Sequence, residues 1–230
     1  MVESGFEFMQ QQIKNLTPAL RIKEGQDFWK WQQAAREKLR ELLGLDLFTP
    51  CDPQLEICWE KEENGVREIR FTFESEAGYR VPCHLLLPPN PDPTPVICLQ
   101  GHSTGMHVSL GRVKLEEDKE TIEHENNYAV QAVNRGFAAI AMEQRYMGEC
   151  GGSENGPGCV HNQALPALLE GKCAIGQRVW DIMRLIDVLE ASFSQYFSVE
   201  KLVCMGNSGG GTATFYAACM EERIAFAMVS

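Results

Sequence analysis

The fold of this chain is decided by one stretch of sequence, Gly206-Asn207-Ser208-Gly209-Gly210-Gly211. An apolar run at 201–205 precedes it and is typical of a buried strand, and a helix is expected from the glycines to about Met220. The first five residues match the pattern G-x-S-x-G. A strand-to-helix turn that projects Ser208 into a cleft brings the backbone close on both sides, and glycine at 206 and 210 leaves the room. Such a turn holds the serine in a strained backbone conformation.

The helix that starts after Ser208 would direct N–H groups and the positive end of its dipole to the place where charge develops on a carbonyl oxygen. A second loop, Gln100-Gly101-His102, follows the earlier apolar run 96–99. In serine hydrolases such a loop supplies one N–H to the oxyanion, and the residue after the nucleophile supplies the other. We therefore predict an oxyanion hole made by the backbone N–H groups of His102 and Gly209.

The glycine stretch has two other interpretations. A glycine-rich turn with a helix-capping serine would also place small residues between a strand and a helix. A dinucleotide-binding loop requires G-x-G-x-x-G, and the spacing of Gly206, Gly209 and Gly211 does not give it. The strand and helix on either side favour the nucleophile turn.

Outward from this stretch, short apolar runs alternate with helical patterns. The alternation is typical of a mostly parallel sheet covered by helices on both faces, an α/β fold. Strands are expected at 96–99, 137–142, 201–205 and 224–229, and helices at 125–135, at 175–193 and after the glycines.

Before residue 88 the pattern changes to three strand-like runs with turn residues between them. These runs, at 54–60, 66–74 and 79–87, predict antiparallel strands at the N-terminal edge of the sheet. An amphipathic helix is predicted over 26–44, with Gly44 as its C-cap. We expect a helical extension over 1–53 and a core over 54–230.

Composition excludes several classes of protein. The 230 residues are 44% hydrophobic and 23% charged, as in ordinary globular domains, and not as in disordered or fibrous chains. A formal net charge of −11 argues against nucleic acid as a partner. The sequence holds no apolar run of membrane-spanning length and no secretory signal, so no membrane association is expected.

The cysteines indicate a reducing compartment. There are nine of them, an odd number without a C-x-x-C pair, so neither a disulfide framework nor a metal site is expected. Cys98 and Cys204 lie in apolar runs and are predicted to be small buried hydrophobes. Cys150 and Cys159 flank a glycine-rich loop and form the one candidate redox pair. The cysteines and the lack of a signal predict a cytoplasmic protein.

Three stretches carry a resemblance to a known family. The order of elements, the elbow at 206–210 and the 100–102 loop are similar to the α/β-hydrolase fold, and more narrowly to its acetyl xylan esterase and dienelactone-hydrolase-like branch. The run Glu143-Gln144-Arg145-Tyr146-Met147-Gly148-Glu149 resembles the branch's Asp-x-Arg-Gly-x-Gly-x. The third stretch is Gly176-x4-Asp181-x2-Arg184-x2-Asp187-x-Leu189. Gln100 in place of His and Tyr146 in place of Gly depart from the family pattern.

The resemblance implies a serine carboxylesterase for small acyl esters, with carbohydrate acetyl esters as the expected substrate. It implies an acyl-enzyme on Ser208 and no metal or organic cofactor, and it leaves a homo-oligomer open. Arg145 is expected to brace the loops around the cleft by charge-assisted hydrogen bonds. Asp181, Arg184 and Asp187 are expected to form ion pairs along one helix face. A peptidase or dienelactone-type hydrolase of the same fold, and a non-catalytic hydrolase-fold fragment or pseudoenzyme, are the alternatives.

A serine nucleophile needs a histidine base and a carboxylate, which in this fold follow it in the chain. After Ser208 the sequence holds Glu221 and Glu222 but no histidine. The five histidines all lie upstream: His84, His102, His107, His124 and His161. We therefore expect a chain that stops after the strand at 224–229, lacks the C-terminal strands of the family domain and is inactive alone.

Overall fold

The computed structural model describes residues 4–102, 105–151 and 160–230, and its chain divides into two compact units, Met1–Leu39 and Arg40–Ser230. The first unit holds α1 (Gly5–Lys14) and most of α2 (Phe28–Leu42), in neither of which a described residue is buried. The predicted helix at 26–44 is thus present and two residues shorter at each end. Gly44 follows it with a left-handed φ of 68°.

The residues just after Leu39 belong to the second unit. This segment contains the short helix η1 (Leu45–Leu47), and its Leu43, Leu45 and Phe48 are buried. The Phe48 ring stacks on Trp180 with 5.1 Å between ring centroids. The division expected after residue 53 stays a prediction.

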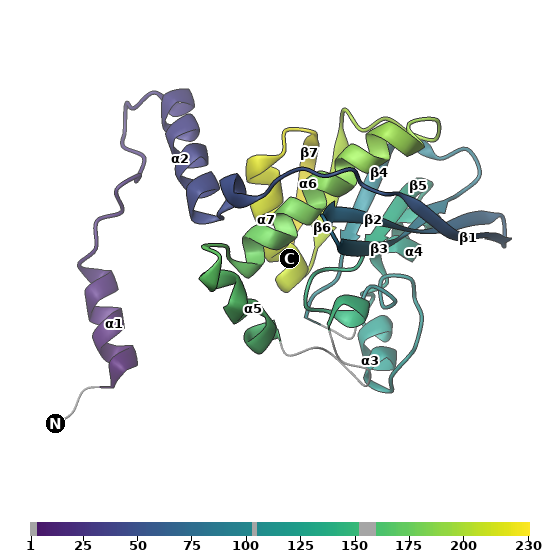
Figure 1. Cartoon of the computed structure of the whole chain (residues 1–230), viewed down its shortest axis with the longest axis horizontal. Coiled ribbons are helices and arrows are strands. Elements are labelled where there is room, and N and C mark those ends of the chain that lie inside the picture. The colour runs from purple at the N-terminus through teal and green to yellow at the C-terminus, as the bar shows by residue number, and fades with distance from the viewer. Residues whose placement is uncertain (1–3, 103–104, 152–159) are drawn as a thin grey trace. The chain divides into compact units, whose positions relative to one another are not determined.

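The second unit is built on one sheet of seven strands in the order β1-β2-β3-β5-β4-β6-β7 (Figure 1). Its antiparallel part is a meander of β1 (Glu56–Glu63), β2 (Val66–Glu76) and β3 (Tyr79–Leu87), as the sequence predicts. Asn64 and Gly65 have φ values of 53° and 78° between the first two strands, which suits a tight hairpin of the twist that sheets prefer.

The other part of the sheet is parallel, which confirms the expected α/β architecture. It contains β4 (Asp92–Leu99), β5 (Phe137–Met142), β6 (Leu202–Gly206) and β7 (Ile224–Val229). β5 joins the two parts by pairing antiparallel with β3. β7 lies at the end of the sheet, and its Phe226, Met228 and Val229 are exposed.

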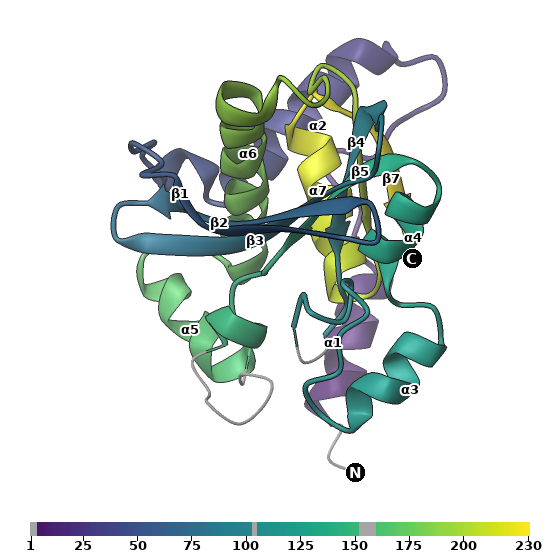
Figure 2. The ribbon, with the colours of Figure 1, turned by 90° about the vertical axis from the view of Figure 1, so that its right-hand side faces the viewer.

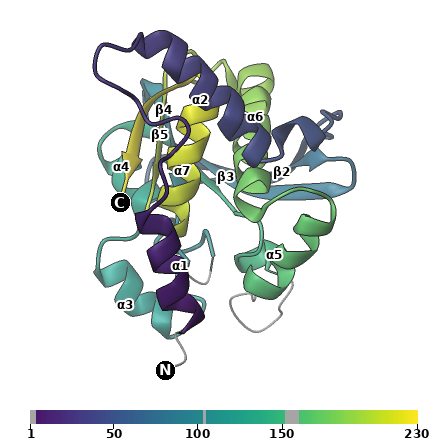
Figure 3. The same cartoon turned by 90° about the vertical axis from the view of Figure 1, so that its left-hand side faces the viewer.

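Helices cover both faces of the parallel part (Figure 2). α4 (Tyr128–Asn134) packs on one face, where Ala129 and Val133 share a cluster with Val96 and Cys98 of β4. Because side chains alternate along a strand, Ile97 and Leu99 point to the other face. On that face α6 (Ala174–Phe193) and α7 (Gly209–Met220) lie side by side (Figure 3).

Three helical segments and the start of one strand differ from the sequence-based expectation. α3 (Glu117–Glu123) forms in the segment expected to be polar loop, and α5 (Val160–Leu169) and the short η2 (Gly148–Cys150) form in the long loop 144–174. β4 begins at Asp92, inside the proline-rich stretch. Across the described parts of the chain, no helix combines the length and apolarity needed to cross a membrane.

Candidate active site

Ser208 lies at the turn between β6 and α7, as predicted. Its backbone has φ 50° and ψ −114°, a conformation that L-residues rarely adopt, and its side chain is exposed. A Cβ at Gly206 would lie 2.4 Å from the carbonyl oxygen of Gly210, and one at Gly210 would lie 2.3 Å from that of Leu99. The two flanking glycines are therefore required by close backbone contact on both sides of the serine.

Backbone hydrogen bonds hold the turn in place. The N–H of Ser208 donates to the carbonyl of Ser230 at 2.7 Å, and the Ser230 N–H donates to Gly206 at 3.0 Å. On the helix side, the Thr212 N–H donates to the Ser208 carbonyl at 2.8 Å. The exposed serine thus sits on a backbone fixed to both neighbouring elements.

The loop after β4 lies against this turn. β4 and β6 are neighbours in the sheet, with Leu99 opposite Gly206, so their carboxyl ends meet. A Cβ at Gly101 would lie 3.3 Å from the Ser208 Cβ, and one at Gly209 would lie 2.6 Å from the His102 ring. The structure therefore brings together the three predicted residues Ser208, Gly209 and His102.

The His102 imidazole packs beside Gly209. Burial lowers the pKa of His102, and the nearby charge of Arg178 lowers it further. Such a ring is neutral over a wider pH range than a solvated histidine. His102 therefore brings no fixed positive charge to the position next to Ser208.

Arg145 joins the loop after β5 to β2 and α6. Its Nε donates to Asp181 at 2.8 Å, and its NH2 group donates to Glu76 at 2.6 Å and to Ser75 at 3.2 Å. Its guanidinium also lies 4.0 Å from the centre of the Tyr79 ring. Burial alone would lower the pKa of Arg145, but the charge and hydrogen bond of Asp181, together with Tyr79 and Glu76, outweigh it and raise the pKa.

Asp181 is placed differently from the sequence-based expectation. It is fully buried and accepts from Arg145 and from the Ser75 hydroxyl at 2.6 Å, so it is not part of an exposed helix-face ion pair. The predicted pairing holds for its neighbours, since Arg184 and Asp187 form an i,i+3 ion pair at 2.6 Å. Helical spacing alone could not show that the aspartate faces a strand.

Sequence reasoning missed a polar link beside the nucleophile. Asn207, the residue before Ser208, donates from Nδ2 to the side chain of Asn126 at 3.3 Å, and the Tyr128 hydroxyl bonds the same Asn126 oxygen. This contact ties the segment before α4 to the elbow. Asn207 occupies a variable position of G-x-S-x-G, so the motif does not predict its contact with Asn126.

Two of the other histidines pair with carboxylates. His84 Nδ1 lies 2.5 Å from Glu68, and His107 Nε2 lies 3.0 Å from Asp118, with all four residues buried. His124 is exposed at the end of α3, and the His161 side chain lies outside the described part of the structure.

The structure confirms the predicted burial of two cysteines. Cys98 and Cys204 are fully buried small side chains in β4 and β6. Cys159 lies outside the described residues, so the candidate pair with Cys150 stays a prediction. Burial raises the pKa of Cys150 to about 12, which keeps this thiol protonated at neutral pH. Among the described residues, no cluster of three or more histidine, cysteine, aspartate or glutamate side chains could hold a metal ion.

A serine on a strained strand-to-helix turn in the parallel part of a mixed sheet, with the loop of the neighbouring strand against it, defines the α/β-hydrolase class. Comparison with known proteins agrees. A model described as the Abhydrolase family matches residues 3–173, and the chain belongs to this family. No curated protein matches the chain.

Solved structures resemble the chain at low sequence identity. A Bacteroides fragilis protein assigned as an acetyl xylan esterase gives a TM-score of 0.83 at 18% identity, over 98% of this chain and 60% of its own. Acetyl xylan esterase 1 from Thermoanaerobacterium sp. gives 0.56 at 17%, over 93% of this chain and 60% of its own. A glucuronoyl esterase from Teredinibacter turnerae gives 0.58 at 18%, over 95% of this chain and 56% of its own. These likenesses establish the fold, and the chain spans about 60% of the length of the first two.

Proposed function

We propose that this chain carries the nucleophile and oxyanion loop of a serine carboxylesterase for small acyl esters. The observation that carries the proposal is the backbone of Ser208, held at φ 50° and ψ −114° between close-packed glycines. A protein tolerates such strain where it serves a site, because each strained residue costs roughly 1–3 kcal/mol. A helix-capping serine would not need this conformation.

In the proposed reaction, the Ser208 hydroxyl oxygen attacks the ester carbonyl and a base takes its proton. The carbonyl oxygen becomes an oxyanion, which the N–H groups of Gly209 and His102 would hold. The alcohol then leaves with a proton, and water releases the acid from the acyl-enzyme in a second attack. Neither step requires a metal or an organic cofactor.

The proposed reaction needs a histidine base, which in this fold follows the nucleophile in the chain. No histidine follows Ser208 in the sequence. We therefore expect the 230-residue chain alone to give no burst of p-nitrophenol from p-nitrophenyl acetate. The same lack of a histidine after Ser208 supports the second candidate function, a non-catalytic hydrolase-fold module.

The proposed substrates are acetyl esters of carbohydrates. Support comes from the solved structures of similar fold, several of which are described as acetyl xylan esterases. A panel of acetylated xylan fragments, p-nitrophenyl esters of increasing acyl length and aminoacyl amides would separate this substrate class from longer acyl esters and from peptides.

The test of the nucleophile is labelling of the native gene product with a fluorophosphonate probe. We expect one labelled serine, which Ser208→Ala removes. The matched control is Ser194→Ala, at an exposed serine that ends α6, and it should leave the label unchanged. An unlabelled native protein, or a label that survives Ser208→Ala, would refute the proposed mechanism.

A further inference from the structure

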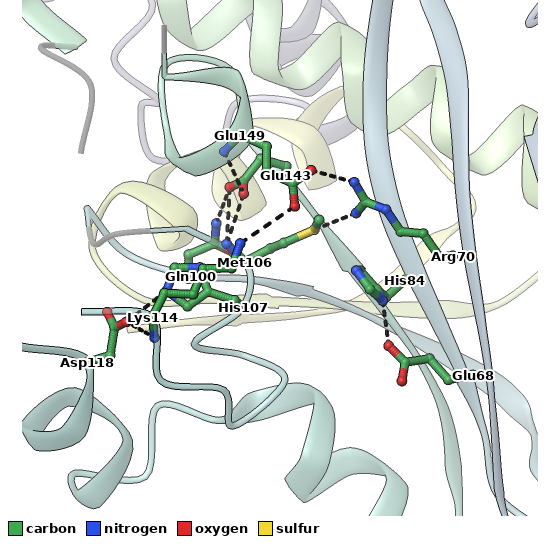
Figure 4. A network of polar contacts seen from close by, with 10 residues as sticks. All are labelled: Glu68, Arg70, His84, Gln100, Met106, His107, Lys114, Asp118, Glu143 and Glu149. Carbon is green, nitrogen blue, oxygen red and sulfur yellow. Dashed lines mark hydrogen bonds and ion pairs between the residues drawn. The ribbon is translucent and has the colours of Figure 1, made fainter. Parts of the chain in front are cut away.

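One buried carboxylate holds both ends of the loop that carries His102 (Figure 4). Glu143 directly follows β5 and is 1% exposed. Its Oε1 accepts from the Gln100 side-chain amide at 2.9 Å and from the Met106 N–H at 3.1 Å. Residues 100 and 106 bracket the loop, so a single oxygen atom closes it at its base.

The other oxygen of Glu143 is held as tightly. Oε2 accepts from the Met106 N–H and the Glu149 N–H, each at 3.2 Å. A Cβ at Gly105 would lie 2.9 Å from Oε2, and one at Gly148 would lie 2.2 Å from it. Both glycines have positive φ, 145° and 44°, so two backbone turns leave space for this carboxylate.

The Gln100 end of the loop is fixed independently. The Gln144 side-chain amide donates to the Gln100 carbonyl at 2.6 Å. The Glu143 backbone is itself fixed, because its N–H donates to the Pro82 carbonyl of β3 at 2.9 Å. The carboxylate is thus a rigid acceptor that reaches from the sheet to the loop.

Uncharged N–H groups make the hydrogen bonds to Glu143 described above. Burial raises the pKa of Glu143 to about 7; the bonds from Met106 and Glu149 lower it, the Glu149 charge raises it and Lys114 lowers it. Four more titratable groups lie close by: Arg70, which pairs with the Glu149 carboxylate, His107, which contacts the Gly105 position, and the thiols of Cys83 and Cys150.

We propose that Glu143 is the positioning residue of the oxyanion loop: its ionised carboxylate holds residues 100 and 106 together and so keeps the His102 N–H beside Ser208. Its protonation places an O–H among groups that donate to the ionised carboxylate, so these hydrogen bonds weaken or rearrange and the hold on the loop is loosened. The catalytic consequence rests on the proposed function, whereas the hold on the loop does not.

The experiment follows the loop without using activity. In a nitrogen-15 NMR titration of the chain from pH 5 to 9, the Met106 and Glu149 amides and the Gln100 side-chain amide should shift together, with one midpoint near pH 7. Glu143→Gln keeps the size of the side chain and removes its ionisation, so it should abolish the shared midpoint. His107→Gln is the matched control, because it removes the neighbouring titratable ring and should leave the midpoint in place.

Amides that do not titrate together in the wild-type chain, or a midpoint that survives Glu143→Gln, would overturn the proposal. So would a midpoint that disappears in His107→Gln and persists in Glu143→Gln, because the histidine would then be the group that controls the loop.

A second arm reads the catalytic consequence in the native gene product. Glu143→Gln should slow fluorophosphonate labelling of Ser208 by about 10-fold or more, since loss of an aligned oxyanion donor reduces rates by at least this factor. Glu143→Asp keeps the charge and should recover part of the rate. Equal rates in wild type and Glu143→Gln would contradict the positioning role. A wild-type protein that is never labelled would refute the proposed function, and the NMR titration would still decide whether Glu143 holds the loop.

Discussion

The free energy of unfolding at acidic pH should depend on the ionisation of Glu68. This β2 side chain is 7% exposed and accepts from Arg112 at 2.5 Å and from His84, with Lys61 at 3.3 Å. Burial alone would raise the pKa of Glu68, but the bonds from His84 and Arg112 outweigh it and lower the pKa to about 2. Glu68→Gln removes the ionisation while keeping the shape of the side chain.

The magnitude follows from the difference between the folded and unfolded pKa values. A carboxyl that titrates near 4.5 unfolded and about 2 folded gains about 3 kcal/mol at neutral pH. The side chains of Arg112 and Lys61 are 37% and 44% exposed, and solvent screening reduces this to about 2 kcal/mol. Because the folded pKa is the lower one, this stability is present above pH 4.5 and is lost as the pH falls toward 2.

The assay is urea unfolding of wild type and Glu68→Gln at pH 7, 5 and 3, followed by tryptophan fluorescence. The excess stability of the wild type should be greatest at pH 7 and should shrink by about 1 kcal/mol or more at pH 3. Glu62→Gln, at an exposed carboxylate on β1, is the matched control and should show no such trend. An excess that stays constant, or grows as the pH falls, would show the reasoning to be wrong.

Three further predictions concern the core and the elbow. The folded pKa of Glu143 is raised, so the wild type loses stability as the pH rises from 4.5 to above 7, whereas Glu143→Gln does not. The variant should therefore gain about 3 kcal/mol relative to wild type over this range. Urea unfolding measures this difference, and a gain by the wild type would contradict it. Gly210→Ala places a Cβ 2.3 Å from a β4 carbonyl and should abolish native circular dichroism or lower the unfolding free energy by about 3 kcal/mol. Asp181→Ala removes the fully buried carboxylate partner of Arg145, leaves Arg145 paired with Glu76, and should cost about 3 kcal/mol in urea unfolding, whereas Asp187→Ala, at a side chain 41% exposed, should cost under about 1 kcal/mol.

The parallel strands and the elbow were predictable because their signals are local. A strand buried on both faces is continuously apolar, as at 96–99 and 137–142, and the glycines around Ser208 mark a turn that few other residues can make. The apolar stripe of α6 was equally plain, and Val179, Ile182 and Leu189 are fully buried.

The missed features depend on contacts between distant segments. β4 extends through Pro93 and Pro95 because its register with β5 shifts between Asp92 and Val96, and a proline is tolerated where a ladder is interrupted. α3 is polar, and Asp118 at its start accepts the backbone N–H groups of Lys114 and Leu115, each at 2.7 Å, which no hydrophobic period reveals.

Buried charge was the hardest part of the site to foresee. Glu143 and Asp181 are typical surface residues by type, and their positions give no local sign of burial. Each is buried because partners from other elements satisfy it: loop N–H groups for Glu143, and Arg145 with Ser75 for Asp181. A single sequence does not contain those pairings.

The glycines of the elbow have a consequence for how lineages of this fold diverge. Each is confined by a different neighbour: Gly206 by the start of α7, Gly209 by the His102 ring, Gly210 by the end of β4, and Gly211 by the Ser230 carbonyl 2.5 Å from a would-be Cβ. The Ser208 side chain is exposed, so its hydroxyl is not needed for packing. Purifying selection for folding alone would thus preserve the glycines, while a descendant that abandoned catalysis could replace the serine. In such lineages the spacing of the glycines would indicate common ancestry of the fold. A serine at position 208 would indicate that the catalytic chemistry has been kept.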